Sequence, residues 1–269
     1  MTDLFHTQQN KFTVDIYGTA DKPHILFFGG WGVPASSYRD RLSLLGEHFF
    51  VYGVSLPGFG DNEPLTFEKN HIRGHAEFFG EYVLPNMELS EGLVLMGHST
   101  GAGVATLIAE QHAGLTSKLI LVSPVGSPDP LHKSLVRMIK EIDLKEALKY
   151  STAEYWRRAL PNMRLGVDAK YIDLVGTLDN LISKGLDVHI FLSQNDRIAP
   201  PGKLPEINNA KIVWVEGGHS WFKDYPDDLL TSMIDIIYPE EVEMEPKGLK
   251  SIWLAVSNYF RRLFNMSAR

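Results

Sequence analysis

The chain contains no cysteine among its 269 residues. This absence excludes disulfides, thiolate metal sites, iron–sulfur clusters and a cysteine nucleophile. It is also typical of proteins in a reducing compartment, so we expect a cytoplasmic location. No stretch is apolar for long enough to span a bilayer. The amino-terminal residues also lack the basic start and apolar core of a signal peptide.

The chain also has no excess of basic residues, with 26 Lys and Arg against 33 Asp and Glu. The formal net charge is -7, which disfavours a general nucleic-acid role because phosphate binding requires a concentrated basic surface. Hydrophobic residues make up 44% and charged residues 22% of the chain, as in ordinary globular proteins. The length suffices for one large domain with a sizeable core. We therefore expect no nucleic-acid partner.

Short, nearly unbroken apolar runs alternate with helical patterns along the chain. Strands that are covered on both faces have this pattern, because neither face can be polar. The alternation favours an α/β fold with a mostly parallel sheet and helices on both faces. The predicted strands cover residues 11–17, 25–28, 50–55, 93–96, 119–122, 188–192 and 212–215, and the predicted helices cover 36–45, 71–82, 100–112, 171–184 and 226–237.

One region interrupts this alternation between two predicted strands. Residues 127–167 have a helical pattern, which predicts a cap over one end of the sheet. Its apolar side chains pack the cap onto the main domain more often than they line a pocket. The candidate substrate contacts are Gly30, Trp31, Met138 and Trp156.

The carboxyl-terminal part of the chain forms a separate segment. An acidic linker at 239–246 follows the main domain, residues 1–238, and precedes a basic amphipathic segment at 247–269. Basic amphipathic helices with aromatic residues can lie in a membrane interface, so peripheral membrane contact is one hypothesis. The same apolar face could instead dock on its own domain or on a second subunit, which leaves the oligomeric state open. Liposome flotation with and without residues 249–269 tests the membrane hypothesis.

A Gly-x-Ser-x-Gly motif at residues 97–101 lies between a predicted buried strand and a predicted helix. A nucleophile at such a junction projects from a sharp turn, where side chains two residues to either side would collide with backbone. Glycine at both positions removes the collision. The first N–H groups of the following helix point toward negative charge that develops in a reaction. The motif in this context predicts that Ser99 is a nucleophile.

A serine hydroxyl needs a general base, because it is a weak nucleophile at neutral pH. Among ten histidines, His219 alone follows a late buried strand at a glycine turn, Gly217 and Gly218, and we predict that it is the base. An acid must in turn orient the imidazole. Asp196, in the loop after the preceding strand, is the preferred candidate, and Asp129 is the alternative.

The order Ser99, Asp196, His219 and the segment Ser-Leu-Pro-Gly-Phe-Gly at 55–60 resemble the α/β-hydrolase fold superfamily. The resemblance extends to about residue 238. It implies a mostly parallel sheet of the eight-stranded type, flanked by helices and carrying a helical cap. It also implies a serine hydrolase of the carboxylesterase or lipase kind that needs no cofactor.

The resemblance further implies an oxyanion hole. In that superfamily the loop after an early strand supplies one backbone N–H donor, often within a His-Gly sequence, and the residue after the nucleophile supplies another. The matching donors here are Trp31 and Thr100. Gly29 stands where histidine is common.

These observations predict hydrolysis of a fairly apolar carboxylic ester through an acyl-enzyme on Ser99. The same residues could serve C–C bond hydrolysis, thioester hydrolysis, acyl transfer or a cofactor-free haloperoxidase-like activity. A ligand receptor without turnover on the same scaffold is a further alternative, because function resides in the site rather than in the fold.

Two other motifs indicate ligands only weakly. The segment Gly-Trp-Gly-Val-Pro-Ala at 30–35 matches a dinucleotide fingerprint, but the next predicted strand does not end in the acid that would bind a ribose. His71 and His75 are spaced like helical metal ligands, but neither a catalytic glutamate between them nor a third ligand is evident. We expect a pair on the helix surface and no metal.

Overall fold

The computed structural model describes residues 2–6, 11–127 and 160–239 of the chain. The chain divides into two compact units, Met1–Pro226 and Asp227–Arg269. The first unit contains the sheet and every site residue discussed below that lies in the described ranges. Residues 240–269 lie outside these ranges. The division into a domain at 1–238, a linker at 239–246 and a helix at 247–269 therefore stays a prediction.

A single sheet of eight strands organises the first unit, in the order β1-β2-β4-β3-β5-β6-β7-β8. Strand β2 runs antiparallel to both β1 and β4, and all other neighbouring pairs are parallel. The predicted mostly parallel sheet is confirmed; the edge strand β1 was not predicted. The strands are β1 (Thr2–His6), β2 (Lys11–Tyr17), β3 (His24–Phe28), β4 (Phe50–Val54), β5 (Leu93–His98), β6 (Thr116–Val122), β7 (Asp187–Ser193) and β8 (Lys211–Val215).

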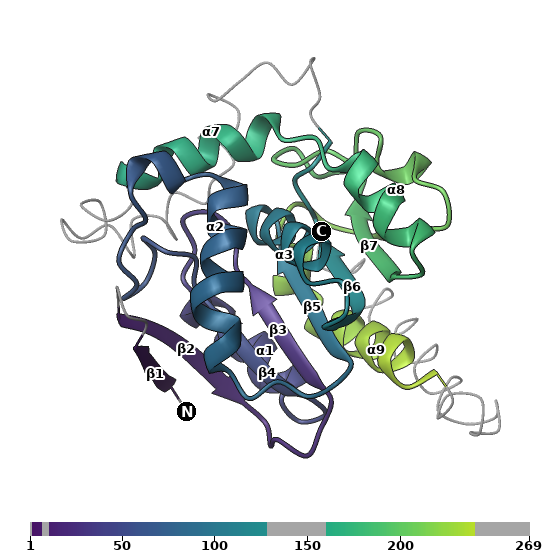
Figure 1. The fold of residues 1–269 in the computed structure, drawn as a ribbon. Helices are drawn as coiled ribbons and strands as arrows, with labels where there is room; N and C mark the ends of the chain where they lie inside the picture. The colour runs from purple at the N-terminus through teal and green to yellow at the C-terminus, as the bar shows by residue number, and fades with distance from the viewer. Residues whose placement is uncertain (1, 7–10, 128–159, 240–269) are drawn as a thin grey trace, which may run out of the picture. The chain divides into compact units, whose positions relative to one another are not determined.

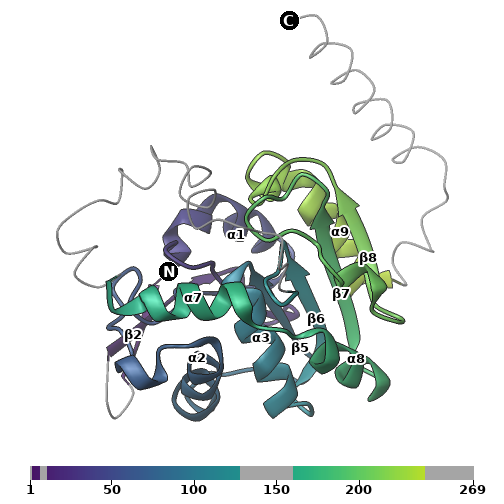
Figure 2. The same cartoon turned by 90° about the horizontal axis from the view of Figure 1, so that it is seen from above.

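Helices cover both faces of the central strands. Helices α2, α3 and α8 lie on one face and α1 lies on the other (Figures 1 and 2). This arrangement explains the unbroken apolar runs, because every residue of β3 and β5 is buried. The helices are α1 (Arg39–Leu45), α2 (Ile72–Phe78), α3 (Thr100–Gln111), α7 (Met163–Tyr171), α8 (Val175–Ser183) and α9 (Pro226–Ile237), and shorter turns lie at Ala35–Tyr38, Phe67–Lys69, Phe79–Val83, Leu84–Asn86, Leu160–Asn162, Leu204–Glu206 and Trp221–Lys223.

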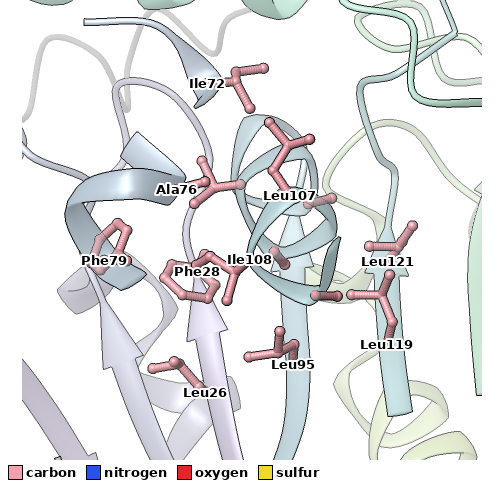
Figure 3. Close-up of a cluster of buried hydrophobic side chains, with 14 of the residues drawn as sticks. Leu26, Phe28, Ile72, Ala76, Phe79, Leu95, Leu107, Ile108, Leu119 and Leu121 are labelled. Carbon is pink, nitrogen blue, oxygen red and sulfur yellow. The ribbon is translucent and has the colours of Figure 1, made fainter. Parts of the chain in front are cut away.

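The core lies between the central strands and the helices α2 and α3. Figure 3 shows apolar side chains of β3, β5 and β6 meeting those of the two helices. Burial of this apolar surface holds α3 firmly against the sheet, and the site described below begins at the first turn of α3. The labelled members of the cluster are Leu26, Phe28, Ile72, Ala76, Phe79, Leu95, Leu107, Ile108, Leu119 and Leu121.

The helix predicted at 171–184 starts too early: α8 begins at Val175, and Tyr171 is the last residue of the preceding helix, α7. Helix α7 ends at Tyr171, and Ile172 after it is extended, with ψ 135°. The Asp173 carboxylate then accepts the N–H of Val175 at 3.0 Å, and the N–H of Leu174 donates to the Gly126 carbonyl at 2.7 Å. A short polar side chain that binds nearby backbone competes with a continuous helix. In the region predicted as one helix at 71–82, the α-helix α2 ends at Phe78, and a π-helical turn at Phe79–Val83 follows it directly.

Part of the predicted cap is described. Helix α7 runs across the edge of the sheet at which the parallel strands end (Figure 1). Residues 128–159 lie outside the described residues, and they include Met138, Trp156 and Asp129. The proposals for these three residues therefore stay predictions.

Candidate active site

The predicted nucleophile lies at the junction of β5 and α3. Ser99 is the residue before the first turn of α3, and it adopts φ 55° and ψ -119°. A positive φ is uncommon for a residue with a side chain and persists only where the surroundings enforce it. The Ser99 side chain makes no capping hydrogen bond to the helix. The hydroxyl therefore stands on a strained turn at the positive end of a 12-residue helix.

The two glycines of the motif are required by close backbone contacts. A Cβ atom on Gly97 would lie 2.5 Å from the Cα of Ala102, and one on Gly101 would overlap the carbonyl oxygens of Phe28 and Gly29. Backbone atoms cannot move aside as a flexible side chain can. The predicted steric reason for the motif is therefore confirmed at both positions.

His219 and Asp196 form the central polar contact of the site. The distance between His219 Nδ1 and Asp196 Oδ2 is 2.8 Å, and the two side chains are only 11% and 1% exposed. The other carboxylate oxygen, Oδ1, accepts the N–H groups of Ile198 and Ala199, both at 2.9 Å. The carboxylate is therefore held by its own loop and presents one oxygen to the imidazole.

A second interaction holds the loop that carries His219. The Ser193 hydroxyl, at the end of β7, donates to the Gly217 carbonyl at 2.5 Å and accepts the N–H of Asn195 at 3.1 Å. Gly217 has φ 102°, a conformation that favours glycine. Ser193 was not identified from the sequence, because nothing in the sequence indicates which loop its hydroxyl reaches.

The loop between β3 and α1 lies beside the nucleophile. A Cβ atom on Gly30 would be 3.4 Å from the Cβ of Ser99, so the two backbones approach each other closely. The N–H of Gly29 donates to the Val54 carbonyl at 3.2 Å, and the N–H of Gly30 donates to the Tyr38 hydroxyl at 3.0 Å. Within the described part of the chain, the N–H groups of Trp31 and Thr100 make no hydrogen bond.

Comparisons with known proteins show the family to which this chain belongs. Residues 25–231 match the alpha/beta hydrolase family. The chain belongs to this family. A pimeloyl-[acyl-carrier protein] methyl ester esterase of Pseudoalteromonas atlantica is 33% identical over 252 residues, which cover 79% of this chain and 93% of that protein. The chain is a hydrolase, and its relatives support ester hydrolysis in general.

Solved structures show the same fold at low sequence identity. An esterase from Exiguobacterium antarcticum has a TM-score of 0.70 and 17% identity and covers 88% of this chain and 99% of its own. A serine hydrolase involved in carbazole degradation has a TM-score of 0.69 and 16% identity, and the match covers 88% of this chain and 98% of that protein. At this identity the likeness shows the fold alone.

A buried polar network connects the loop at Trp31 of this hydrolase to the base of the cap. The Trp31 Nε1–H donates to the Asn162 carbonyl at 2.9 Å. The Asn162 side chain donates to the Pro57 carbonyl at 2.7 Å and accepts a short hydrogen bond from Asn70. Asn70 and Asn162 are fully buried. Sequence reasoning missed both residues, because asparagine in a loop is an ordinary turn residue.

The expectation of a surface pair at His71 and His75 was wrong. His71 is the N-cap residue of α2, and its Nδ1 accepts a hydrogen bond from the N–H of Gly74 at 3.0 Å. His75 is fully buried, its Nε2 is 2.9 Å from the Asn70 Oδ1, and its Nδ1 has no partner among the described residues. Burial, with a smaller contribution from His71, lowers the pKa of His75 to about 3. The imidazole therefore serves the buried network as a neutral donor.

Ser55 also has a role that the sequence did not indicate. Its hydroxyl accepts the N–H of Ala35 at 2.7 Å and so fixes the start of the turn before α1.

In the described ranges, no three His, Asp or Glu side chains gather as metal ligands would. No helix within those ranges is long and apolar enough to cross a membrane.

Proposed function

We propose that this hydrolase cleaves carboxylic esters through an acyl-enzyme on Ser99. The observation that carries the proposal is the buried His219–Asp196 pair, 2.8 Å apart, with the main-chain carbonyl oxygen of His219 3.1 Å from Nε2 of His98, the residue before Ser99. The His219 ring lies 4.8 Å from the ring of His98, the neighbour of Ser99. An imidazole oriented by a carboxylate beside a serine on a strained turn is the arrangement that activates a hydroxyl.

The proposed reaction assigns one step to each group. Ser99 Oγ attacks the ester carbonyl while His219 Nε2 takes its proton. The N–H groups of Trp31 and Thr100 bind the oxyanion, a contribution of roughly 3 kcal/mol for each donor. His219 then protonates the leaving alcohol, and the acyl group stays on Ser99. Water activated by His219 releases the acid and restores the serine.

Asp196 holds the reactive tautomer in this proposal. Its Oδ2 accepts a hydrogen bond from the N–H at His219 Nδ1, which leaves the unprotonated Nε2 as the base. The alternative acid, Asp129, lies outside the described residues. The contact of Asp196 therefore supports Asp196 as the partner of His219.

The substrate proposed is an ester of a small alcohol with a fairly apolar acyl part. Relatives that hydrolyse a pimeloyl-[acyl-carrier protein] methyl ester support this class. We propose Gly30 and Trp31 as substrate contacts beside Ser99. Met138 and Trp156 remain proposed contacts from the cap. Peripheral membrane contact through residues 247–269 and a cytoplasmic location also remain predictions from the sequence.

A fluorophosphonate probe tests the proposed chemistry. We expect labelling of the wild type at Ser99 and its loss or strong reduction in Ser99→Ala and His219→Ala. Ser123→Ala is a matched control. Ser123 is also a buried serine with positive φ, 45°, next to the end of a neighbouring strand, and its loss should leave labelling intact. A folded wild type that stays unlabelled contradicts the proposal and favours a receptor without turnover.

Product analysis then separates reactions that share the same triad. Purified protein is given a methyl ester, the corresponding acyl-carrier-protein methyl ester, a thioester and a vinylogous diketone. Preferred release of methanol supports the proposed ester hydrolysis. Preferred cleavage of the thioester or of the C–C bond replaces it with that chemistry, and transfer of the acyl group to an added alcohol indicates an acyltransferase.

A further inference from the structure

A chain of hydrogen bonds connects the three segments of the proposed active site. The N–H of Gly30 donates to the Tyr38 hydroxyl at 3.0 Å, and this hydroxyl lies 2.9 Å from His98 Nδ1. His98 Nε2 in turn lies 3.1 Å from the main-chain carbonyl oxygen of His219. This series of hydrogen bonds therefore runs from the loop of Trp31, past the turn of Ser99, to the backbone of the proposed base.

The partners define the direction of each hydrogen bond. A carbonyl oxygen only accepts, so the proton of His98 lies on Nε2 and points to His219. The Nδ1 of a neutral imidazole is then an acceptor, and the Tyr38 hydroxyl donates to it. The oxygen of Tyr38 keeps a lone pair that accepts the N–H of Gly30. One set of proton positions satisfies all three contacts.

Packing holds the two rings in place. Tyr38 is 1% and His98 3% exposed. The Tyr38 ring stacks on Phe222 with centroids 5.8 Å apart and planes 10° apart, and the His98 ring meets the same phenylalanine edge-on at 4.9 Å. Side chains fixed by such packing lose little freedom when they form hydrogen bonds, so they can position backbone accurately.

The small residues of the neighbouring loop fit around these rings. A Cβ atom on Gly29 would lie 3.1 Å from Tyr38 Cε2, and one on Gly30 would lie 3.3 Å from His98 Nδ1. A larger residue at either place would have to displace the ring beside it. The glycines at 29 and 30 and the rings of Tyr38 and His98 therefore form one packed unit.

We propose that Tyr38 and His98 are positioning residues that hold the oxyanion loop and the backbone of His219 in register with Ser99. The inference rests on the proposed function. Tyr38 occupies the N–H of Gly30 and so orients the next peptide, whose N–H we assign to the oxyanion. His98 holds the residue of the proposed base by its carbonyl, while Asp196 holds it by its ring. The network acts on geometry in the transition state more than on substrate binding.

Kinetics of Tyr38→Phe test this role with little disturbance of packing. This variant keeps the ring and removes the hydroxyl from both of its partners. Tyr52→Phe is the matched control, because Tyr52 is also buried and its hydroxyl donates to the Glu88 carbonyl at 2.8 Å, away from the site. The measurements are the fluorophosphonate titre, kcat and KM with a p-nitrophenyl ester, and the Ki of a boronic acid that forms a tetrahedral adduct.

For Tyr38→Phe we expect kcat to fall roughly tenfold, less than for the loss of an oxyanion donor itself. The boronic acid Ki should rise in parallel, with KM within about twofold and the titre unchanged. Tyr52→Phe should resemble the wild type. His98→Gln, whose amide can still donate toward His219, should retain more activity than His98→Ala. The kcat of the double variant with Tyr38→Phe and His98→Ala should be less than tenfold below the kcat of His98→Ala alone, because the two residues share one network.

The outcomes separate this inference from the proposed function. A wild type that neither labels nor turns over an ester overturns the proposed function and the positioning role with it. An active wild type with an equally active Tyr38→Phe variant overturns the positioning role alone. A loss confined to the titre, with kcat per labelled site and Ki unchanged, also overturns it, because that result reports only fewer folded molecules.

Discussion

Replacement of His75 by glutamine should remove a pH-dependent part of the stability of this hydrolase. The buried imidazole donates from Nε2 to Asn70, and its Nδ1 has no partner among the described residues. A second proton would therefore have no acceptor in the folded state, and burial lowers the pKa to about 3 from the ordinary 6.5. A glutamine amide can replace the donor to Asn70 without titrating.

The magnitude follows from the two pKa values. Above about pH 6.5 the imidazole is neutral in both states, so it adds no pH dependence. Below this pH the unfolded chain binds a proton that the folded chain does not, and stability falls until the pH approaches the folded-state value of about 3. Each pKa unit corresponds to about 1.4 kcal/mol. At about pH 5, about 1.5 units below 6.5, the loss is therefore about 2 kcal/mol.

Urea unfolding followed by tryptophan fluorescence measures this loss, since the chain has five tryptophans. Free energies of unfolding at about pH 8 and about pH 5 are compared for the wild type, His75→Gln and the control His48→Gln, which removes an exposed histidine. The drop between the two pH values should be about 2 kcal/mol smaller in His75→Gln than in the wild type. Equal drops in these two proteins would refute the reasoning.

Two further substitutions address the triad and the elbow. Asp196→Asn should lower kcat by roughly 10⁴-fold with little change in KM, whereas Asp129→Asn should leave kcat unchanged; the reverse result in ester kinetics would assign the acid to Asp129. Gly101→Ala should abolish labelling and destabilise the fold by about 3 kcal/mol, because the new Cβ overlaps the carbonyls of Phe28 and Gly29. The control is Gly176→Ala in α8, where nothing lies within 4 Å of the new Cβ. Helix propensity should raise the stability of this variant by up to about 1 kcal/mol. Equal thermal midpoints for Gly101→Ala and Gly176→Ala would contradict the steric account.

Local requirements explain why much of the fold could be predicted. The apolar runs at β3, β5 and β7 indicate strands that are buried on both faces, and these three strands lie inside the sheet between parallel neighbours. The start of the helix predicted at 171–184 could not be predicted correctly, because the break before α8 includes the N–H of Leu174 donating to the Gly126 carbonyl. That partner lies about 50 residues away in the chain and leaves no local pattern.

The sequence by itself determined the candidate nucleophile, its glycine neighbours and the order of the candidate acid and base, because the steric demands of a strand-to-helix turn act within a few residues. Only the tertiary structure decided how these groups are supported. Tyr38 meets His98 across 60 positions of the chain, and Trp31 meets the Asn162 carbonyl across 131. Such contacts depend on where the packed core places distant loops, and a hydrogen bond between them requires an accuracy of a few tenths of an ångström that no local pattern encodes.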